Sequence, residues 1–357
     1  MQKVSEKFNE ACAPCAPRIK DKLLAVSDEI KKETFEIRMR AEGALILCGT
    51  YGCGFINSDG RFSLIYPKSP VVVTKQELDA TLSRMCSFSM HTYQQNLVDG
   101  YITLSGGHRV GVCGTAVNEK SIIMSVREIS SLNIRIAREI YGVSRKILDE
   151  VFYEHISSLI IAGPPSSGKT TLIRDIAREL SGGFGCCYRK VVIADERGEI
   201  AAIKDGIPQN DIGLNSDVIC GFPKGIAIMN ALKSMSPEVI ICDEVGTKDE
   251  IKAIEYGLNS GVKFILTVHA SSYEELKRKK QIKMLLETGE FNNIVLLKSG
   301  RVPGIMDKII NCEVLLNEIR RGNTFGDYGS YDGTAFGTST EKTYKDFDRD
   351  TAVYFSR

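Results

Sequence analysis

Short apolar segments alternate with segments of helical pattern through the second half of the chain. The segments "SSLIIAG", "KVVIAD", "EVIICDE" and "VKFILTVHA" are apolar at nearly every position, as expected for strands that helices cover on both faces. Between them lie residues 168–181 and the segments "GIAIMNALKSM" and "KDEIKAIEYGL", which we interpret as helices. This order predicts an α/β domain with a parallel sheet, whose ligands bind at the carboxyl ends of the strands.

The first part of the chain has a different pattern. Residues 18–40 predict a helix followed by the strand "FEIRMR", and short β-rich segments come next. A helical pattern returns between Lys75 and Gly100. The alternation in "GYITLSGGHRVGVCGTAV" then predicts a β-hairpin around Gly106 and Gly107. We therefore predict a small α+β domain ahead of the α/β domain.

These patterns divide the chain into four segments. We predict a mobile N-terminus at 1–17, an α+β domain at 18–140, the α/β domain at 141–320 and a flexible Gly/Tyr-rich tail at 321–357. The tail has few aliphatic residues, so it cannot bury enough apolar surface to offset the entropy of ordering. Cys12 and Cys15 form a C-x-x-C in the N-terminal segment with no strand before it, and we expect free thiols there.

Length and charge narrow the class of protein. The 357 residues are enough for two ordinary domains, and a net charge of +1 gives no general support for nucleic-acid binding. No apolar run approaches the roughly 18–20 residues that cross a bilayer, and no signal peptide opens the sequence. Several of the 11 cysteines, such as Cys220 and Cys242, lie inside apolar runs. We therefore expect a soluble, cytoplasmic protein in a reducing compartment.

The segment "GPPSSGKTT" matches the phosphate-binding pattern G-x-x-x-x-G-K-[ST] between a predicted strand and a predicted helix. Backbone N–H groups of such a loop turn inward around phosphates, and the helix N-terminus favours an anion. Lys169 would neutralise charge on the β- and γ-phosphates, and Thr170 would offer its hydroxyl to Mg²⁺. With ATP and Mg²⁺ as cofactors, the predicted binding residues are Gly163, Pro164, Pro165, Ser166, Ser167, Gly168, Lys169, Thr170 and Thr171.

Acidic residues and a histidine follow three other predicted strands. Asp243 would hold Mg²⁺, and Glu244 would polarise a water for attack on the γ-phosphate, which favours ATP hydrolysis over phosphoryl transfer to a small molecule. Asp195 and Glu196 form a second acidic cluster that would orient water or metal, or else a surface ion-pair cluster. His269 would hydrogen-bond the γ-phosphate or the attacking water. The catalytic candidates are therefore Glu244, Glu196 and His269.

An arginine from outside the core site can stabilise the charge of a transferring phosphoryl group. The candidates for such an arginine finger are Arg109, Arg135, Arg138 and Arg197, and the sequence does not rank them. A finger supplied by a neighbouring subunit requires a homo-oligomer.

Two sets of motifs resemble known families. The series "GPPSSGKTT", "VVIADERGEIA", "SPEVIICDEVGTKDEI" and "GVKFILTVHASS" resembles the ATPases of type II and type IV secretion and of twitching pili. The segments "GYITLSGGHRVGVCG", "SLNIRIARE", "SDVICGFPKGIAIMNALKSMSPEVIICDEVG" and "PGIMDKI" resemble the stage III sporulation AA family of endospore-forming bacteria. The resemblance covers roughly residues 20–312.

This resemblance implies a RecA-like P-loop ATPase core after a smaller α+β domain. It also implies a mother-cell cytoplasmic ATPase that forms a ring, expected to be a hexamer. The ring would lie beneath membrane-embedded sporulation channel proteins that link the mother cell to the forespore. Two departures matter: the secretion ATPases often have Gly at the position of Asp243, and their arginine-rich stretch is replaced here. Lys224 or an arginine of the first domain would then supply the positive charge.

Two other functions are compatible with a P-loop. A nucleic-acid-stimulated ATPase has the same core fold, but no nucleic-acid-binding module is visible and the charge is balanced. A scaffold that binds ATP without turnover is the second, and Glu244 argues against it. An ATP turnover assay distinguishes the enzyme from the scaffold.

Overall fold

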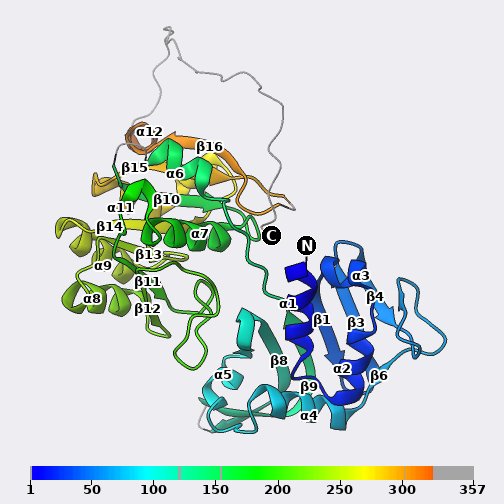
Figure 1. The fold of residues 1–357 in the computed structure, drawn as a ribbon. Helices are drawn as coiled ribbons and strands as arrows, with labels where there is room; N and C mark the ends of the chain where they lie inside the picture. The colour runs from blue at the N-terminus through cyan, green and yellow to red at the C-terminus, as the bar shows by residue number, and fades with distance from the viewer. Residues whose placement is uncertain (1, 120–121, 153–154, 301, 325–357) are drawn as a thin grey trace. The chain divides into compact units, whose positions relative to one another are not determined.

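Two seven-stranded sheets organise the chain in the computed structural model, which describes residues 2–119, 122–152, 155–300 and 302–324 (Figure 1). Each sheet belongs to a separate unit. One unit contains the residues up to Ile140 together with Asp195–Leu214, and the other contains Tyr141–Ala194 with the described residues from Asn215 on. Within the described residues, no helix is both long and apolar enough to span a bilayer.

The first unit is an α+β structure whose seven-stranded sheet has the order β5-β4-β3-β1-β9-β8-β7. Within the described residues, the neighbouring strands of this sheet pair in antiparallel orientation. The elements are α1 (Gln2–Cys12), α2 (Pro17–Leu24), α3 (Asp28–Glu33), β1 (Thr34–Arg40), β2 (Gly43–Ala44), β3 (Ile46–Gly49), β4 (Gly52–Ile56), β5 (Phe62–Ser63), β6 (Val72–Val73), α4 (Lys75–Met85), α5 (Gln94–Val98), β7 (Tyr101–Thr103), the 3₁₀ turn η1 (Ser105–Gly107), β8 (Arg109–Glu119) and β9 (Ile122–Arg135).

The predicted hairpin is confirmed. β7 pairs with β8 in antiparallel register, and the turn between them contains Gly106 at φ 76° and Gly107 at φ 79°. Glycine adopts these left-handed conformations without the steric cost that a Cβ brings. The two glycines therefore set the turn that the sequence pattern indicated.

The N-terminal segment corrects the expectation of a mobile end, while Cys12 and Cys15 carry free thiols as predicted. Residues 2–12 form α1 rather than a mobile end, and Phe8, Cys12 and Cys15 are fully buried in the core of the first unit. Phe8 and Cys12 are four residues apart, so they lie on one face of the helix. Burial raises the pKa of Cys15 to about 12 and that of Cys12 well above its ordinary value. Both thiols therefore stay protonated as core side chains.

A disulfide joins Cys48 and Cys53, which corrects the expectation that the cysteines are reduced thiols. The two residues face each other in the antiparallel register of β3 and β4, with their Cα atoms 4.1 Å apart. Opposed positions of two neighbouring antiparallel strands bring the side chains close enough to bond. The sequence pattern of short β segments did not reveal which positions would be opposed.

Asp195–Leu214 packs with the first unit, although the sequence pattern assigned it to the α/β domain. The Gly106 N–H donates to Oε1 of Gln209 at 2.9 Å, and the Lys204 ammonium donates to the Ser105 hydroxyl at 3.1 Å. These side chains bind the glycine turn of the β7–β8 hairpin. The polar contacts explain why the segment leaves the strand-and-helix pattern around it.

The second unit confirms the predicted α/β fold. Its sheet has the order β12-β11-β13-β14-β10-β15-β16, in which β11, β13, β14, β10 and β15 pair in parallel and β16 runs antiparallel to β15. The elements are α6 (Arg145–Val151), β10 (Ser158–Gly163), α7 (Lys169–Ser181), η2 (Phe184–Cys186), β11 (Val191–Asp195), β12 (Ser216–Cys220), α8 (Lys224–Ser234), β13 (Val239–Cys242), α9 (Lys248–Asn259), β14 (Lys263–His269), α10 (Tyr273–Arg278), α11 (Lys280–Glu287), β15 (Phe291–Leu297), β16 (Met306–Asn311) and α12 (Cys312–Thr324).

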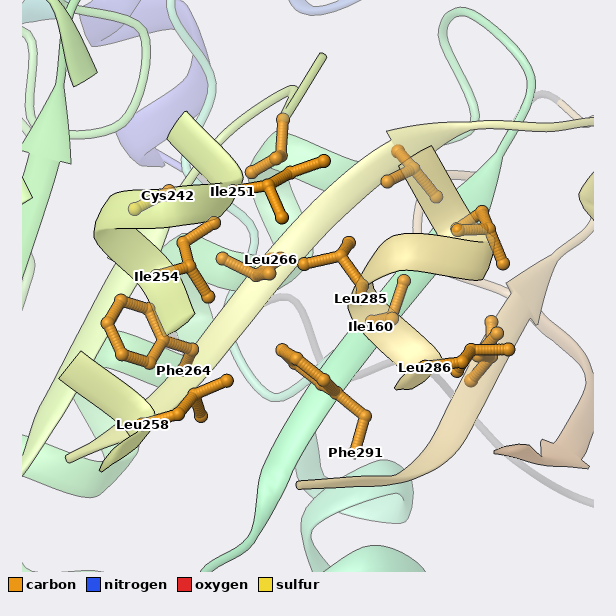
Figure 2. Close-up of a cluster of buried hydrophobic side chains, with 14 of the residues drawn as sticks. Ile160, Cys242, Ile251, Ile254, Leu258, Phe264, Leu266, Leu285, Leu286 and Phe291 are labelled. Atoms are coloured by element: carbon orange, nitrogen blue, oxygen red, sulfur yellow. The ribbon is translucent and has the colours of Figure 1, made fainter. Parts of the chain in front are cut away.

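The core of the second unit explains why its strands are apolar throughout. Figure 2 shows part of a buried cluster in which Ile160 of β10 and Phe264 of β14 lie with Ile254 of α9 and Leu285 of α11. The alternate strand residues, such as Ile161, are also fully buried. Both faces of the sheet are therefore covered, and all six positions of β10 are buried.

The predicted boundary of the tail is also corrected. α12 continues through Thr324, so the helix extends past residue 320, where the α/β domain was expected to end. Leu315 and Ile319 of this helix are buried in the core of the second unit. The prediction of a flexible tail for 325–357 falls outside the described residues.

Candidate active site

The phosphate-binding loop connects β10 to α7 and has the strand–loop–helix context that the motif requires. Gly168 caps α7 in a left-handed conformation at φ 92°, and Ser166 also has a positive φ of 61°. A Cβ at Gly168 would lie 2.4 Å from the backbone nitrogen of Gly304 and 2.4 Å from Cβ of Pro303. Only glycine fits this position, because both its dihedral angle and its surroundings exclude a side chain.

Lys169 points back across the loop. Its ammonium donates to the carbonyl oxygens of Gly163 at 3.0 Å and Pro164 at 2.9 Å, and its side chain is buried. Burial lowers the pKa of Lys169 from its ordinary value, while the carboxylates of Asp243 and Glu244 act in the opposite direction. The loop thus holds a buried cation where the β- and γ-phosphates of a nucleotide are expected.

Asp243 follows β13 and contacts the helix that begins at the loop. The Thr170 hydroxyl donates to Oδ2 of Asp243 at 2.7 Å, and the Thr267 hydroxyl donates to Oδ1. A threonine hydroxyl next to a carboxylate is an all-oxygen donor pair, which is the chemistry that Mg²⁺ prefers. Within the described ranges, no group of three or more His, Cys, Asp and Glu side chains gathers to hold a metal. The chemistry of the Thr170–Asp243 pair therefore fits Mg²⁺.

Glu244, His269 and Lys169 form a continuous chain of contacts. Nε2 of His269 lies 2.7 Å from Oε1 of Glu244, and Nδ1 of His269 lies 3.1 Å from the Lys169 ammonium. An ammonium can only donate, so Nδ1 accepts, and the imidazole proton is then assigned to Nε2, which donates to the carboxylate. The histidine of the fourth predicted strand thus orients the carboxylate proposed to activate water.

The second acidic cluster has a different arrangement. Asp195 is buried and accepts backbone hydrogen bonds from Glu199 at 2.8 Å, Ile200 at 3.1 Å and Ala201 at 2.9 Å. Its carboxylate therefore holds the turn after β11, which differs from both interpretations of the sequence, a group that orients water or metal and a surface ion-pair cluster. Glu196 is exposed and belongs to the first unit, so it is not among the residues that the second unit brings together. Its catalytic role stays a prediction.

All four candidate arginines belong to the first unit. Arg109 pairs with Glu199 at 2.7 Å and stacks over the Tyr101 ring, with its guanidinium carbon 3.7 Å from the ring centroid. Arg135 and Arg197 are exposed.

Arg138 is tied into the first unit more closely. Its guanidinium donates to the carbonyl oxygens of Lys32 at 2.6 Å and Thr34 at 2.7 Å, and burial lowers its pKa. This guanidinium binds one carbonyl at the end of α3 and one at the start of β1, so it stabilises the fold of the first unit. This contact favours the exposed Arg135 and Arg197 over Arg138 as fingers.

Sequence reasoning missed two contributors to the site. Thr267 binds Asp243 and Glu244, and it lies two residues before His269, on the same face of the strand by the period of two. That spacing was the available signal in the sequence.

The second contributor is Gly304, within the quoted segment "PGIMDKI". It donates its N–H to the carbonyl of Ser167 at 2.8 Å and lies against Gly168. No sequence pattern predicts that the turn at Gly304 packs against the phosphate loop.

Comparison with known sequences identifies relatives over most of the chain. The model of the family described as "Sporulation stage III, protein AA" matches residues 13–314. Stage III sporulation protein AA of Bacillus subtilis (strain 168) is 38% identical over 237 residues, which cover 66% of this chain and 77% of that protein. Uncharacterized protein ycf45 of Porphyra purpurea is 33% identical over 174 residues, which cover 48% of this chain and 30% of that protein.

Comparison with solved structures identifies the fold. The ATPase DotB of Legionella pneumophila aligns with a TM-score of 0.50 at 15% identity, covering 82% of this chain and 80% of that chain. The pilus retraction motor PilT with bound ADP aligns with a TM-score of 0.51 at 15% identity, covering 82% and 85%. At this identity the likeness establishes the fold alone, which is the RecA-like P-loop core with an N-terminal domain that secretion ATPases have.

Proposed function

The chain belongs to the sporulation stage III protein AA family, and from that premise we propose that it binds and hydrolyses ATP as the mechanochemical ATPase of a secretion-like sporulation complex. One observation carries the proposal. Three segments of the second unit bring five polar side chains together. His269 contacts both the Lys169 ammonium and the Glu244 carboxylate, and the Thr170 hydroxyl donates to Asp243.

Each of these groups has a defined task in the proposed reaction. The loop and the N-terminus of α7 would bind the phosphates, and Lys169 would neutralise their charge. Thr170 and Asp243 would hold Mg²⁺, which would supply positive charge to offset the charge that develops on the phosphates. Glu244 would accept the proton of the attacking water, while His269 keeps the carboxylate oriented. The products would be ADP and inorganic phosphate.

Phosphate release from ATP by the purified protein tests the activity. Glu244→Gln keeps the shape of the side chain but is a far weaker base, so turnover should fall by about a hundredfold or more while ATP binding persists. Glu274→Gln is the matched control, because Glu274 is an exposed residue of α10 whose carboxylate pairs with Lys277. If turnover by Glu244→Gln equals that of the control, another group activates the water, and Glu196 is the first candidate.

Nucleotide binding is tested separately with Lys169→Ala. Loss of the ammonium should weaken ATP binding and turnover together, because Lys169 contacts phosphates in both the ground and transition states. Lys252→Ala is the control, since Lys252 is an exposed residue of α9. Unchanged ATP affinity in the Lys169 variant would contradict the phosphate-binding role of the loop. Binding without any turnover by the wild-type protein would indicate the scaffold instead.

We expect the active form to be a homo-oligomer, and the family resemblance favours a hexameric ring. It also favours location in the mother cell, against membrane-embedded sporulation channel proteins. An arginine supplied by a neighbouring subunit is worth about 10³-fold or more in other phosphoryl-transfer enzymes, so specific activity should rise with protein concentration. Turnover that single-stranded DNA stimulates, with a steep salt dependence, would favour a nucleic-acid-dependent ATPase instead.

Mixing two inactive variants tests the shared site. Subunits with Glu244→Gln are combined with subunits carrying Arg109→Ala, Arg135→Ala or Arg197→Ala, and partial recovery is expected if the arginine acts in trans. Recovery arises because some mixed interfaces contain both an intact glutamate and an intact arginine. If no arginine variant is rescued and activity per subunit does not change on dilution into monomers, the proposal of an oligomeric site is wrong.

A further inference from the structure

The backbone of Glu244 has an unusual conformation. Its φ of 47° lies in the left-handed region, which residues with a Cβ rarely adopt without support from the surrounding structure. Glu244 directly follows Asp243 at the end of the buried strand β13. Any relaxation to an ordinary φ would redirect the carboxylate that meets His269.

Two side chains from other elements hold the backbone of this residue. The Glu244 N–H donates to the Thr267 hydroxyl at 2.8 Å, and the Glu244 carbonyl accepts from the Lys224 ammonium at 2.9 Å. Thr267 lies on β14, and Lys224 is the first residue of α8. The two polar groups of one strained peptide segment are therefore bound from two directions.

Thr267 can hold the Glu244 backbone because its side chain is fully buried and its hydroxyl makes two hydrogen bonds. It is fully buried, accepts from the Glu244 N–H and donates to Oδ1 of Asp243. Its own carbonyl accepts from the N–H of Val245 at 3.0 Å. A single residue of β14 thus contacts three successive residues after β13, through the Asp243 carboxylate and the backbone N–H groups of Glu244 and Val245.

Lys224 is fixed in the same region by a second partner. Its ammonium lies 3.7 Å from Oε1 of Glu250, and its side chain is only 11% exposed. Glu250 accepts from the N–H groups of Gly246 at 2.8 Å and Thr247 at 2.9 Å at the start of α9. Lys224 therefore connects the beginning of α8, the Glu244 carbonyl and the cap of α9. The sequence had suggested it as a cation for the phosphates.

We propose that Thr267 and Lys224 are positioning residues that hold Glu244 in its left-handed conformation, so that its carboxylate is aimed for water activation. The inference rests on the proposed ATP hydrolysis, because positioning has a kinetic meaning only if Glu244 is the base. Neither residue needs to touch the nucleotide. Each acts through the backbone of Glu244, and Thr267 acts also through Asp243.

The kinetic test uses substitutions that remove a hydrogen bond and keep the volume. Thr267→Val and Lys224→Met should each lower kcat by about tenfold or more, while KM for ATP changes by less than about twofold. Thr267→Ser keeps the hydroxyl and should recover most of kcat. Thr288→Val and Lys263→Met are matched controls, because they make the same changes at residues that do not bind Glu244. The Thr288 hydroxyl donates to the Leu285 carbonyl at the end of α11, and the Lys263 ammonium donates to Glu290. A weakened ATP affinity in Lys224→Met with kcat unchanged would assign Lys224 to the phosphates and overturn its role.

A double-substitution test separates positioning from general damage. In the Glu244→Gln background, Lys224→Met should cause little further loss of turnover, because the carboxylate through which it acts is gone. An additional tenfold loss in that background would overturn the proposal for Lys224. Thr267→Val should in addition raise the Mg²⁺ concentration needed for half-maximal rate, since Thr267 also binds Asp243. Lys224→Met should leave that concentration unchanged.

Hydrogen exchange tests the inference without turnover, so its outcome is independent of the proposed function. In Thr267→Val, backbone amides of residues 243–247 should exchange faster than in Thr267→Ser, because the Glu244 N–H has lost its acceptor. Equal exchange in the two folded variants would show that the hydroxyl does not hold this segment. Absence of ATP turnover in the wild-type protein, with faster exchange in Thr267→Val, would reject the function and leave the backbone contact established.

Discussion

Gly168→Ala tests the geometry of the phosphate loop most directly. A left-handed residue with a Cβ costs roughly 1–2 kcal/mol relative to glycine, and Gly168 has φ 92°. The new Cβ would also lie 2.4 Å from the Gly304 nitrogen and from Pro303, so the two segments must separate. Overpacking of this kind adds about 1–3 kcal/mol. We therefore expect the substitution to destabilise the loop by about 2–5 kcal/mol.

Gly261→Ala is the matched control for this substitution. Gly261 has φ 84°, and a Cβ there would meet nothing within 4 Å, so only the backbone cost of roughly 1–2 kcal/mol applies. Comparison of the two variants by urea unfolding isolates the contribution of the contact with Pro303 and Gly304. If Gly168→Ala unfolds at the same urea concentration as Gly261→Ala, the close approach of these segments is wrong.

The same variant has a consequence for ligand binding. Strain at Gly168 is relieved by a shift of the loop, which moves its N–H groups away from the phosphates. Each 1.4 kcal/mol lost from binding is tenfold in Kd, so ATP affinity should fall by about tenfold or more. Titration calorimetry with a slowly hydrolysed ATP analogue measures this loss. Wild-type affinity in Gly168→Ala, together with unchanged stability, would refute the reasoning.

Three further predictions concern the first unit. Asp195→Asn should reduce the free energy of unfolding by about 1.5–3 kcal/mol, measured by urea denaturation, because three backbone N–H groups lose a charged acceptor. Arg138→Met should likewise lower stability by about 1–3 kcal/mol, with turnover per folded molecule unchanged; a selective loss of turnover would restore Arg138 as a finger. Burial lowers the pKa of His108 from 6.5 to about 4, despite the opposing effect of Glu10. Between these two pH values the imidazole of the unfolded chain is protonated, whereas the imidazole of the folded protein is neutral. This contribution to stability is complete above pH 6.5 and is lost as the pH falls toward about 4; an NMR titration midpoint near 6.5 for His108 would contradict it.

Local sequence patterns predicted the elements of the α/β unit and much of its candidate site. Strands that are buried on both faces must be apolar throughout, and a phosphate loop needs glycine and lysine at fixed spacing, so both features are visible without the fold. The carboxylates after β13 and the histidine at the end of β14 were predicted because parallel strands present their carboxyl ends at one edge of a sheet. The structure brings Lys169, Glu244 and His269 into contact as that rule requires.

Other features depended on contacts between distant segments, which no local pattern encodes. The sequence predicted that Asp195 either orients water or metal or belongs to a surface ion-pair cluster, but its buried carboxylate binds the backbone of the next turn. Cys12 looked like part of a mobile end, but its helix packs into a core whose other residues come from far along the chain. The support of Glu244 by Lys224 and Thr267 joins residues 20 and 23 positions away. Residue type and spacing therefore determined which chemistry the chain carries, whereas the tertiary structure alone decided which polar groups are already bound and which are aimed at a substrate.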